Sequence, residues 1–392
     1  MSNFEVIIED YYTKLQSLKF SGEIVFMLMS STFKDSFDKY FKEENKGAEI
    51  PKEEEVTEPE NDSITMTYRE YQRFKTLTNG IDILPKSLLV SAVSIYDVFI
   101  SKIIEEFFMC KPDALSMINQ DIKFSELSTF TSIEEAKKHL IWREIDLLLR
   151  NSHIEHLKWL EKKCKINGLT TDNKWLLNFI EVTERRNLFV HNDGIVNKQY
   201  IGVCEENGVD VSHLNEQERL KCDKEYFNKA FSVLYEFGIL LAHTLWRKLL
   251  PEEIDQANNF IHDQSVNMII DGNLDSVIEI LTYFKDKLSR QLDEESLMII
   301  DINLAQTYKW KGDQEKCEEL LNKRKWMTYN NKYKLAYYCL MNDYENSAKI
   351  LKILDEQEEI DKDQIRNWPL FKEARTNETF QNSFQEKFGE PI

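Results

Sequence analysis

Hydrophobic residues recur at intervals of three and four along much of this 392-residue chain, which is the period of an α-helix. The strongest such run follows Pro85 and reads PKSLLVSAVSIYDVFISKIIEEFF. Its apolar stripe is wide, as in a helix that packs on two sides, and proline suits a first helical turn. The pattern therefore predicts a long core helix that begins at Pro85 and carries a polar residue, Asp97, in its middle.

Three further segments with the same period extend this helix into a predicted bundle. A helical region covers about 133–165, a third helix covers about 173–191 after an N-cap at Asp172, and a fourth covers about 223–249. Four helices of this kind indicate an all-α bundle that spans residues 85–250.

Two segments beside the third helix predict changes of chain direction. The sequence HNDG at 191–194 ends the helix, because Asn, Asp and Gly tolerate left-handed backbone geometry. Residues 199–214 contain a short alternating pattern and an Asn-Gly pair, which fits a small hairpin or an ordered loop. Either form would connect the third and fourth helices.

The N-terminal segment, residues 1–84, mixes apolar and charged positions and is expected to be helical over its first half. Within it, residues 42–62 are acidic, contain two prolines and lack aromatic residues, which is typical of a mobile linker. An acidic stretch that imitates RNA and blocks a basic site is the alternative interpretation.

Residues 251–392 repeat a pattern of a turn followed by a helix. The segments GNLDSVIEIL, GDQEKCEELL and NDYENSAKIL begin at 272, 312 and 342, and the last two follow a leucine, an alanine and a tyrosine in the same order. This order resembles the tetratricopeptide (TPR) repeat, a stacked pair of helices. The resemblance implies a TPR-like helical repeat domain, and an ordinary helical domain is the alternative.

Composition restricts where the chain can bind nucleic acid. The net charge of −19 repels a polyanion on average, so any RNA site must be a local basic pocket. The six cysteines are far apart and form no CxxC pair, which predicts neither a disulfide framework nor a zinc site. The N-terminus lacks a signal-peptide core, and the apolar run at 24–29 is too short to cross a membrane. We expect a soluble, cytoplasmic protein that does not contact a membrane.

The sequence ERRNLFVHNDG, at 184–194, carries the residues best suited to chemistry. On a helix that ends near His191, the side chains of Glu184, Asn187 and His191 share one face, because they are three and four residues apart. Arg186 flanks that face. The segment therefore places an arginine beside a histidine at the end of a helix.

Such a pair has the properties that RNA cleavage requires. RNA supplies its own nucleophile, the 2′-hydroxyl, and histidine transfers protons at cellular pH. Arginine stabilises the charge on phosphate oxygens without a metal ion. A helix C-terminus favours a protonated His191, while Leu188 and Val190 are expected to point into the bundle and hold the helix in place. In the alternative interpretation, His191 caps the helix and Arg186 forms a surface ion pair.

A second segment, RNSHIEH at 150–156, has a similar spacing. Arg150, Asn151 and His156 match the pattern of an arginine, a polar residue and a histidine. Charged residues surround this segment on both sides, which favours a solvated helix face.

The sequence RRNLFVHNDGIVNKQY resembles the signature of the HEPN superfamily, named for the higher eukaryotes and prokaryotes nucleotide-binding domain. That signature is an arginine, then a polar residue, and then a histidine, with four to six residues between the arginine and the histidine. Arg186, Asn187 and His191 match it, and the resemblance extends over 85–250. It implies a HEPN-like helical bundle, followed in this chain by the TPR-like repeats.

The resemblance also implies a reaction and roles for the residues. Active HEPN proteins are typically metal-independent endoribonucleases in which two domains meet, so that both Arg-His motifs share one composite cleft. Carried over by position, His191 would transfer a proton, Arg186 would hold the scissile phosphate, and Asn187 would orient the phosphate or the histidine. Arg185 and Glu184 would support this site, with Arg185 adding to a small basic pocket, and Asp97 is a further supporting candidate.

The implied biology is a toxin or an antiviral defence effector. RNA would be the substrate, a homodimer would form through the HEPN domain, and the C-terminal repeats would bind a protein inhibitor or a trigger. Neither a cofactor nor a metal ion is expected. Some HEPN toxins carry a tyrosine two residues after the histidine, which a partner modifies; here that residue is Asp193. The alternative function is a non-catalytic nucleotide- or RNA-binding module whose repeats act as a scaffold, and a purely structural adaptor is a third.

Overall fold

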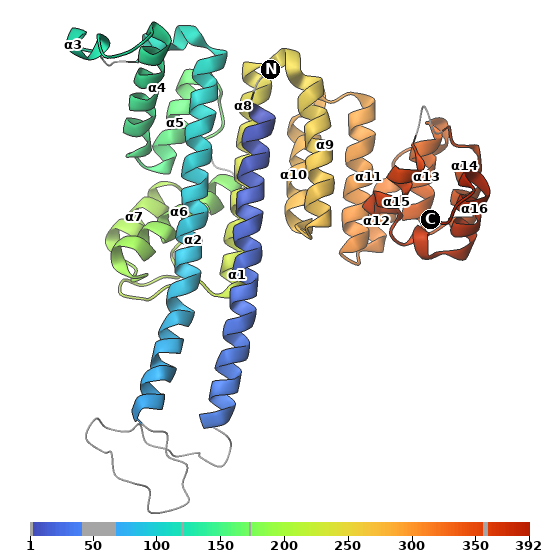
Figure 1. Cartoon of the computed structure of the whole chain (residues 1–392), viewed down its shortest axis with the longest axis horizontal. Coiled ribbons are helices and arrows are strands. Elements are labelled where there is room, and N and C mark those ends of the chain that lie inside the picture. The colour runs from blue at the N-terminus through green and yellow to red at the C-terminus, as the bar shows by residue number, and fades with distance from the viewer. Residues whose placement is uncertain (1–2, 41–67, 119–120, 172–173, 356–359) are drawn as a thin grey trace, which may run out of the picture. The chain divides into compact units, whose positions relative to one another are not determined.

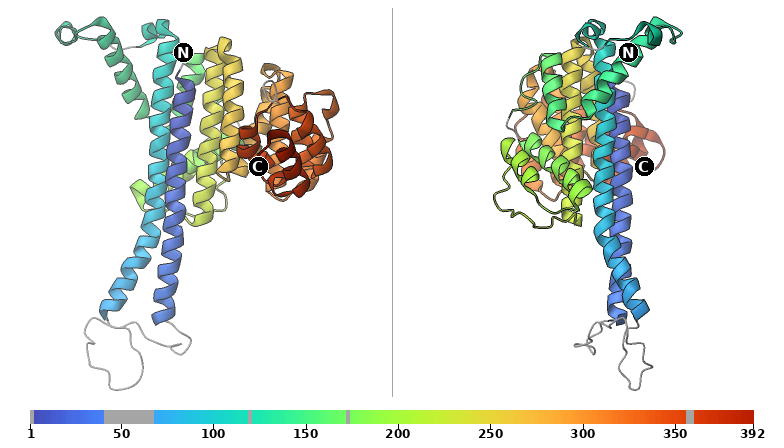
Figure 2. Two further views of the ribbon diagram at one scale, coloured as in Figure 1. Left: turned by 45° about the vertical axis from the view of Figure 1, so that its right-hand side comes forward. Right: turned by 90° about the vertical axis from the view of Figure 1, so that its left-hand side faces the viewer.

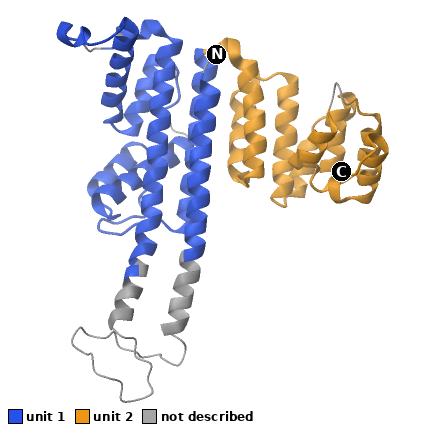
Figure 3. Cartoon of the chain, in the orientation of Figure 1, with its two compact units in different colours: residues 1–249 blue, residues 250–392 orange. Residues whose placement is uncertain are grey.

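The computed structural model describes residues 3–40, 68–118, 121–171, 174–355 and 360–392, and it divides the chain into two compact units (Figure 3). Unit 1 is Met1–Leu249 and unit 2 is Leu250–Ile392. The fold is all-α, as the sequence predicts. Within the described ranges, strand-type pairing is limited to one isolated bridge between Ile195 and Arg219. The acidic segment 42–62 and the N-cap expected at Asp172 lie outside the described residues.

Two long helices form the spine of unit 1. α1 (Phe4–Tyr40) and α2 (Tyr68–Cys110) run side by side, and α8 (Lys224–Leu249) packs against both (Figures 1 and 2). The described part of the N-terminal segment therefore shares one core with the bundle, because Phe4, Ile8 and Leu15 are buried in it.

α2 differs from the helix expected from the sequence. It begins at Tyr68, and Pro85 lies inside it. Proline lacks the N–H of one helical hydrogen bond, but a buried helix tolerates this loss when tertiary packing supplies most of its stability. The part of α2 from Asn79 to Cys110 is long and apolar enough to cross a membrane, a property that it shares with the buried core helices of soluble proteins.

Aromatic rings fill the middle of the bundle. Phe179 and Phe237 stack with their centroids 4.1 Å apart, and Tyr96 packs 4.7 Å from Phe179. Gly238 allows Tyr11 to approach α8, since a Cβ atom at Gly238 would lie 2.3 Å from the tyrosine ring. Burial of these rings accounts for much of the stability of unit 1.

Shorter helices cover the spine. They are α3 (Phe124–Leu127), α4 (Ile133–Leu149), α5 (His153–Cys164), α6 (Lys174–Asn192) and α7 (Lys198–Glu206).

The structure confirms some of the predicted bounds and corrects others. The third and fourth predicted helices correspond to α6 and α8, while the region predicted at 133–165 is interrupted at 150–152. Residues 199–214, for which the sequence predicts a hairpin or loop, begin with a helix, α7. The side chain of Asn197 caps α7 by accepting a hydrogen bond from the backbone N–H of Tyr200, at 2.9 Å.

Unit 2 consists largely of antiparallel helix pairs. Its helices are α9 (Ile254–Ile270), α10 (Leu274–Lys287), α11 (Glu294–Trp310), α12 (Gln314–Leu321), α13 (Asn331–Leu340), α14 (Tyr344–Ile353), α15 (Lys362–Asn367) and α16 (Glu378–Phe388).

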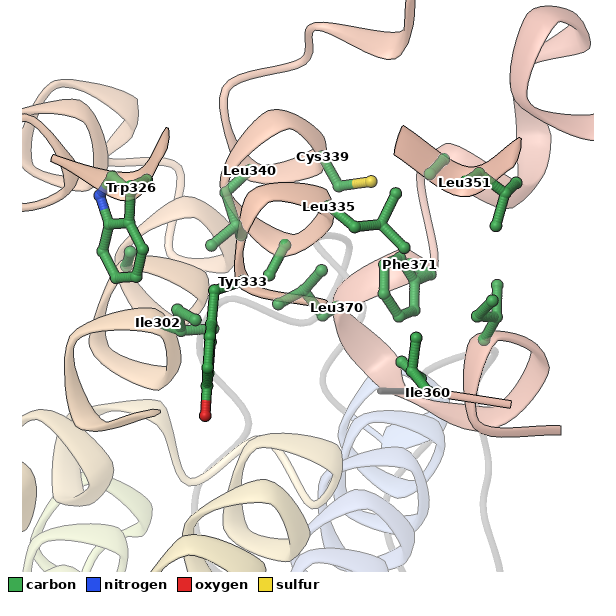
Figure 4. Close-up of a cluster of buried hydrophobic side chains, with 14 of the residues drawn as sticks. Ile302, Trp326, Tyr333, Leu335, Cys339, Leu340, Leu351, Ile360, Leu370 and Phe371 are labelled. Atoms are coloured by element: carbon green, nitrogen blue, oxygen red, sulfur yellow. The ribbon is translucent and has the colours of Figure 1, made fainter. Parts of the chain in front are cut away.

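The three helix starts recognised in the sequence are α10, α12 and α14. Each follows a tight turn in which Gly272, Gly312 or Asn342 has a positive φ. Figure 4 shows the core between the later pairs, where Trp326, Leu335 and Phe371 are buried. The indole N–H of Trp326 donates to the carbonyl of Leu321 at 2.6 Å.

Candidate functional site

A polar pocket of about 420 Å³ lies in unit 1 where α2, α5, α6 and the start of α7 meet. Its volume is within the range of ligand-binding pockets. The three motif residues, Arg186, Asn187 and His191, all line it, and so does the supporting candidate Glu184. Asp97 also lines it, although it is distant from the motif in sequence.

Arg186 is the centre of a hydrogen-bonded network on the pocket wall. One of its terminal nitrogens donates to Asn187 Oδ1 at 3.0 Å, and the other lies 3.7 Å from Asp97 Oδ2. Asn187 in turn donates to Glu184 Oε1 at 3.4 Å. Since a guanidinium has five N–H donors, these contacts leave capacity for a bound anion.

Asp97 connects Arg186 to a histidine that the motif does not contain. His153 begins α5, is buried, and lies with Nε2 2.9 Å from Asp97 Oδ1. A carboxylate only accepts hydrogen bonds, so Nε2 of His153 carries the proton and Nδ1 is the acceptor. Asp97 therefore holds one side chain from α6 and one from α5 in fixed positions.

The second carboxyl of the pocket has a shifted titration. Burial raises the pKa of Glu184 above its usual value, while the hydrogen bond from Asn187 and the charge of His153 act in the opposite direction. Glu184 therefore takes up a proton more readily than an exposed glutamate as the pH falls. Its protonation would reduce the negative charge beside Arg186.

His191 lies at the exposed end of α6 and at the edge of the pocket. The helix ends there because Asp193 and Gly194 both have positive φ. A side chain at Gly194 would lie 2.8 Å from the carbonyl oxygen of Leu220, so only glycine fits.

Ion pairs fix the turn that follows His191. Asp193 lies 2.8 Å from Arg219 and 3.5 Å from Lys86 of α2, and the charge of Lys86 and the hydrogen bond from Arg219 lower the pKa of Asp193. Asp193 thus has a structural role at the position after the motif.

Arg185 does not lie in the pocket, which corrects its expected role as part of a basic pocket. Its Nε donates to Glu181 at 2.6 Å, and its guanidinium stacks 3.8 Å from the ring centroid of Tyr226. Burial lowers the pKa of Arg185, but interactions with Tyr226 and Glu181 outweigh it and hold that pKa above its usual value. Consecutive helical residues point about 100° apart, so Arg185 and Arg186 reach different surroundings.

The pocket is consequently balanced in charge and is not strongly basic. Arg150 and Arg186 face Asp97 and Glu184 across its lining.

Val190 also departs from expectation, because its side chain is 48% exposed, whereas Leu188 is buried as predicted.

The segment at 150–156 is part of the same pocket, which corrects its interpretation as a solvated face. Arg150 and Asn151 are exposed, but His153 and His156 are buried and line the pocket. Burial, followed by the charge of His153, lowers the pKa of His156 to about 4. The sequence does carry a signal for this burial: both histidines share a helical face with Leu157 and Leu160.

A neighbouring hollow of about 410 Å³ extends the surface beyond the pocket. It shares Ser152, Glu184, Asn187 and Gln199 with the pocket and continues along α5 and α7 past Lys158 and Asn207. Together the two hollows form a continuous polar depression on unit 1.

The remaining candidates for chemistry are few. No cluster of three or more His, Cys, Asp or Glu side chains able to hold a metal ion occurs in the ranges that the structure describes. None of the six cysteines, all within the described ranges, forms a disulfide, and burial raises the pKa of Cys164, Cys204, Cys222 and Cys339 to about 12. These thiols are therefore poor nucleophiles.

Comparisons with known protein families, with curated proteins and with solved structures find no match to the chain.

Proposed function

We propose that the protein is a metal-independent endoribonuclease of the HEPN type. The observation that carries this proposal is the meeting of Arg186, Asn187 and His191 in one pocket, with the guanidinium held by Asp97. The packing of α2, α6 and α8 supports a HEPN-like arrangement of unit 1. The successive pairs α9 and α10, α11 and α12, and α13 and α14 support a TPR-like arrangement of unit 2.

In this reaction, the 2′-hydroxyl of RNA attacks the adjacent phosphorus and displaces the 5′-oxygen of the next nucleotide. The products are a 2′,3′-cyclic phosphate and a 5′-hydroxyl. Arg186 would stabilise the charge on the phosphate oxygens, with Asn187 holding its guanidinium in the pocket. His191, at the exposed end of α6, would give a proton to the departing oxygen.

A homodimer would complete this site. An exposed His191 at the pocket edge is accessible to a second chain, and two pockets that meet would double the number of arginines around one RNA strand. This arrangement also suits the net charge of −19, because it concentrates positive charge at one place on an acidic protein.

Unit 2 would bind a protein inhibitor or a trigger. Its helices enclose a largely apolar pocket of about 590 Å³ that Ile299, Asn303 and Trp368 help to line. Asn303 is fully buried, and its Oδ1 has no hydrogen-bond partner among the described residues. A ligand that donates a hydrogen bond there would satisfy this oxygen. The whole protein would then be a cytoplasmic toxin or antiviral effector that a partner restrains or activates.

A non-catalytic RNA- or nucleotide-binding module is the second candidate. One observation favours it: Asp97 and Glu184 line the same pocket as Arg186, and their negative charges oppose a phosphate. In a nuclease, protonation of Glu184 would remove one of these negative charges, and a dimer would bring a second Arg186 to the same phosphate.

The decisive experiment incubates the purified full chain with end-labelled RNA in EDTA and maps the new ends. We expect 2′,3′-cyclic phosphate and 5′-hydroxyl ends from the wild type, and a loss of at least about 100-fold in His191→Ala and Arg186→Ala. His213→Ala is the matched control, because His213 is an exposed histidine that does not line the pocket. Intact RNA together with retained RNA binding would support the binding module instead.

Light scattering tests the dimer. A protein that remains monomeric at concentrations at which it cleaves RNA would exclude the composite site.

A further inference from the structure

His153 is the residue of the pocket for which the proposed function has no role. It comes from α5, while the proposed catalytic residues come from α6, yet both groups line the same cavity. Its burial requires an explanation, because an imidazole next to a carboxylate is an unusual choice for a position that only needs to fill space.

Geometry gives His153 a defined tautomer. Asp97 Oδ1 accepts the Nε2 proton at 2.9 Å, which leaves the lone pair on Nδ1. When Nδ1 takes up a proton, the resulting positive charge is stabilised by the carboxylate at Nε2. An acidic side chain that orients an imidazole and stabilises its charged form is the arrangement found behind histidine general bases.

Neighbouring residues restrict the ring further. His153 packs against the rings of Tyr96, His156 and Phe179, with centroid separations of 5.9, 5.4 and 5.8 Å. These contacts come from three different helices, so the imidazole has little freedom to rotate. A fixed orientation of this kind is what proton transfer requires.

We propose that His153, oriented by Asp97, is the general base of the same pocket in which His191 is the general acid. This inference rests on the proposed ribonuclease function and assigns both proton transfers to one chain. Nδ1 of His153 removes the 2′-hydroxyl proton while the 2′-oxygen bonds to phosphorus. The bond from phosphorus to the 5′-oxygen breaks, and that oxygen takes a proton from His191. The cyclic phosphate and the 5′-hydroxyl account for all substrate atoms. His153 ends the step with one proton more and His191 with one proton fewer, and exchange with solvent restores both.

The first test compares cleavage of labelled RNA by the wild type, His153→Gln, Asp97→Asn, His191→Ala and the control His213→Ala. Glutamine can still donate to Asp97 but cannot take up a proton. We expect cleavage by His153→Gln to fall about 100-fold, with the far-ultraviolet circular dichroism and the melting temperature close to those of the wild type. Cleavage within about threefold of the wild type would overturn the inference. Inactive His191→Ala in the same series would then leave the proposed function in place.

An activated substrate separates the base from the acid. In uridine 3′-(4-nitrophenyl phosphate), the leaving group departs without a proton, so a general acid is dispensable. We expect His191→Ala to recover at least tenfold on this substrate relative to RNA, as a rough estimate, and His153→Gln to stay impaired on both. The reverse pattern would overturn the assignment of the base. If the wild type cleaves neither substrate, the inference falls together with the proposed function.

The pH dependence supplies a readout that a purely structural residue would not change. The titratable and charged groups around His153 come from every neighbouring element: Asp97 and Tyr96 from α2, Arg150 at the end of α4, His156 from its own helix, Glu184, Arg186 and His191 from α6, and Tyr200 from α7. We expect His153→Gln to lose the rise of kcat/KM on the acidic side of the profile, whereas the fall on the basic side persists with His191. An unchanged acidic limb would show that another group is the base.

Mixed dimers test whether the pair acts within one chain. Co-expressed His153→Gln and His191→Ala chains give heterodimers in which each pocket lacks one of the two imidazoles. We expect no recovery of cleavage. Recovery to about a quarter of the wild-type rate, the order expected if half of the dimers each regain one of two sites, would show that the imidazoles come from different chains and would overturn the inference.

Discussion

Two neighbouring arginines on α6 have opposite surroundings. Arg185 is held by Glu181 at 2.6 Å and by the ring of Tyr226, whereas Arg186 lies 3.7 Å from its nearest carboxylate, Asp97. Glu181 is itself satisfied, since it also accepts hydrogen bonds from Tyr200 at 3.1 Å and Tyr226 at 2.9 Å. Arg185 is thus occupied by a carboxylate and an aromatic ring of its own protein, whereas Arg186 lines the pocket. A charged side chain becomes available for chemistry when its own protein does not saturate it.

The largest expected effect comes from the removal of Arg185, which holds Glu181 in a hydrogen-bonded network. Arg185→Ala leaves the half-buried Glu181 without its cation, and removal of one partner of such a shielded ion pair costs about 3 kcal/mol, the lower end of the range for buried pairs. Arg186→Ala should cost only about 1 kcal/mol, because its contacts are longer and Asp97 keeps its bond to His153. Urea unfolding of both variants measures the difference, and equal losses would contradict the contrast between the two arginines.

Buried His156, which lines the pocket together with Arg186, should make the free energy of unfolding depend on pH. The pKa of His156 is about 4 in the folded chain and 6.5 when exposed, so only the unfolded chain takes up a proton between these values. Stability is therefore complete above pH 6.5 and is lost as the pH falls toward 4, by about 3 kcal/mol at 1.36 kcal/mol per unit. Buried His243, whose pKa is also lowered, adds to the same loss.

Unfolding of His156→Gln across pH 4.5–7.5, an interval of about 3 units chosen to span the titration, isolates this contribution. The variant should show a shallower decline than the wild type, and parallel curves would mean that His156 is exposed to protonation in the folded chain.

A more conservative change sharpens the comparison at the arginines. Arg186→Lys keeps the positive charge but loses the planar fork that reaches Asn187 and a phosphate together. We expect kcat/KM for RNA to fall about 30-fold, near 2 kcal/mol, while folding is preserved. Wild-type cleavage in Arg186→Lys would show that charge alone is sufficient.

The smallest expected effect belongs to Arg150, the second arginine of the pocket. Arg150 is exposed and pairs with Asp146 at 2.7 Å within one turn of helix. Arg150→Ala should change the free energy of unfolding by less than about 0.5 kcal/mol and raise KM for RNA with kcat unchanged. A large fall in kcat would mean that Arg150, and not only Arg186, contacts the reacting phosphate.

Helical periodicity predicts the architecture well because burial sets it. α6 and α8 begin and end close to their predicted bounds, and the turn at Asp193 and Gly194 follows from residues that accept a positive φ. The turns at Gly272, Gly312 and Asn342 follow from the same residue preference.

Sequence patterns predict the site less well than the fold, because the site depends on contacts between distant segments. Asp97 meets His153 only when α2 packs beside α5, and no local pattern encodes that distance. Arg185 and Arg186 have different surroundings because Arg185 contacts Glu181 on its own helix and Tyr226 on α8. The alternating pattern at 199–214 predicts a hairpin or a loop, but the structure has a helix, α7, there. This helix begins after a cap at Asn197.

The interruption between α4 and α5 has one more consequence. Residues 150–152 set the rotational phase with which α5 enters the bundle, and α5 opens directly on His153. Deletion of one residue from this joint would turn the following helix by about 100° and bring Ile154 and Leu157 to the positions of the two imidazoles. The length of this three-residue joint thus determines which side chains of α5 line the pocket, even when the sequence of α5 is unchanged.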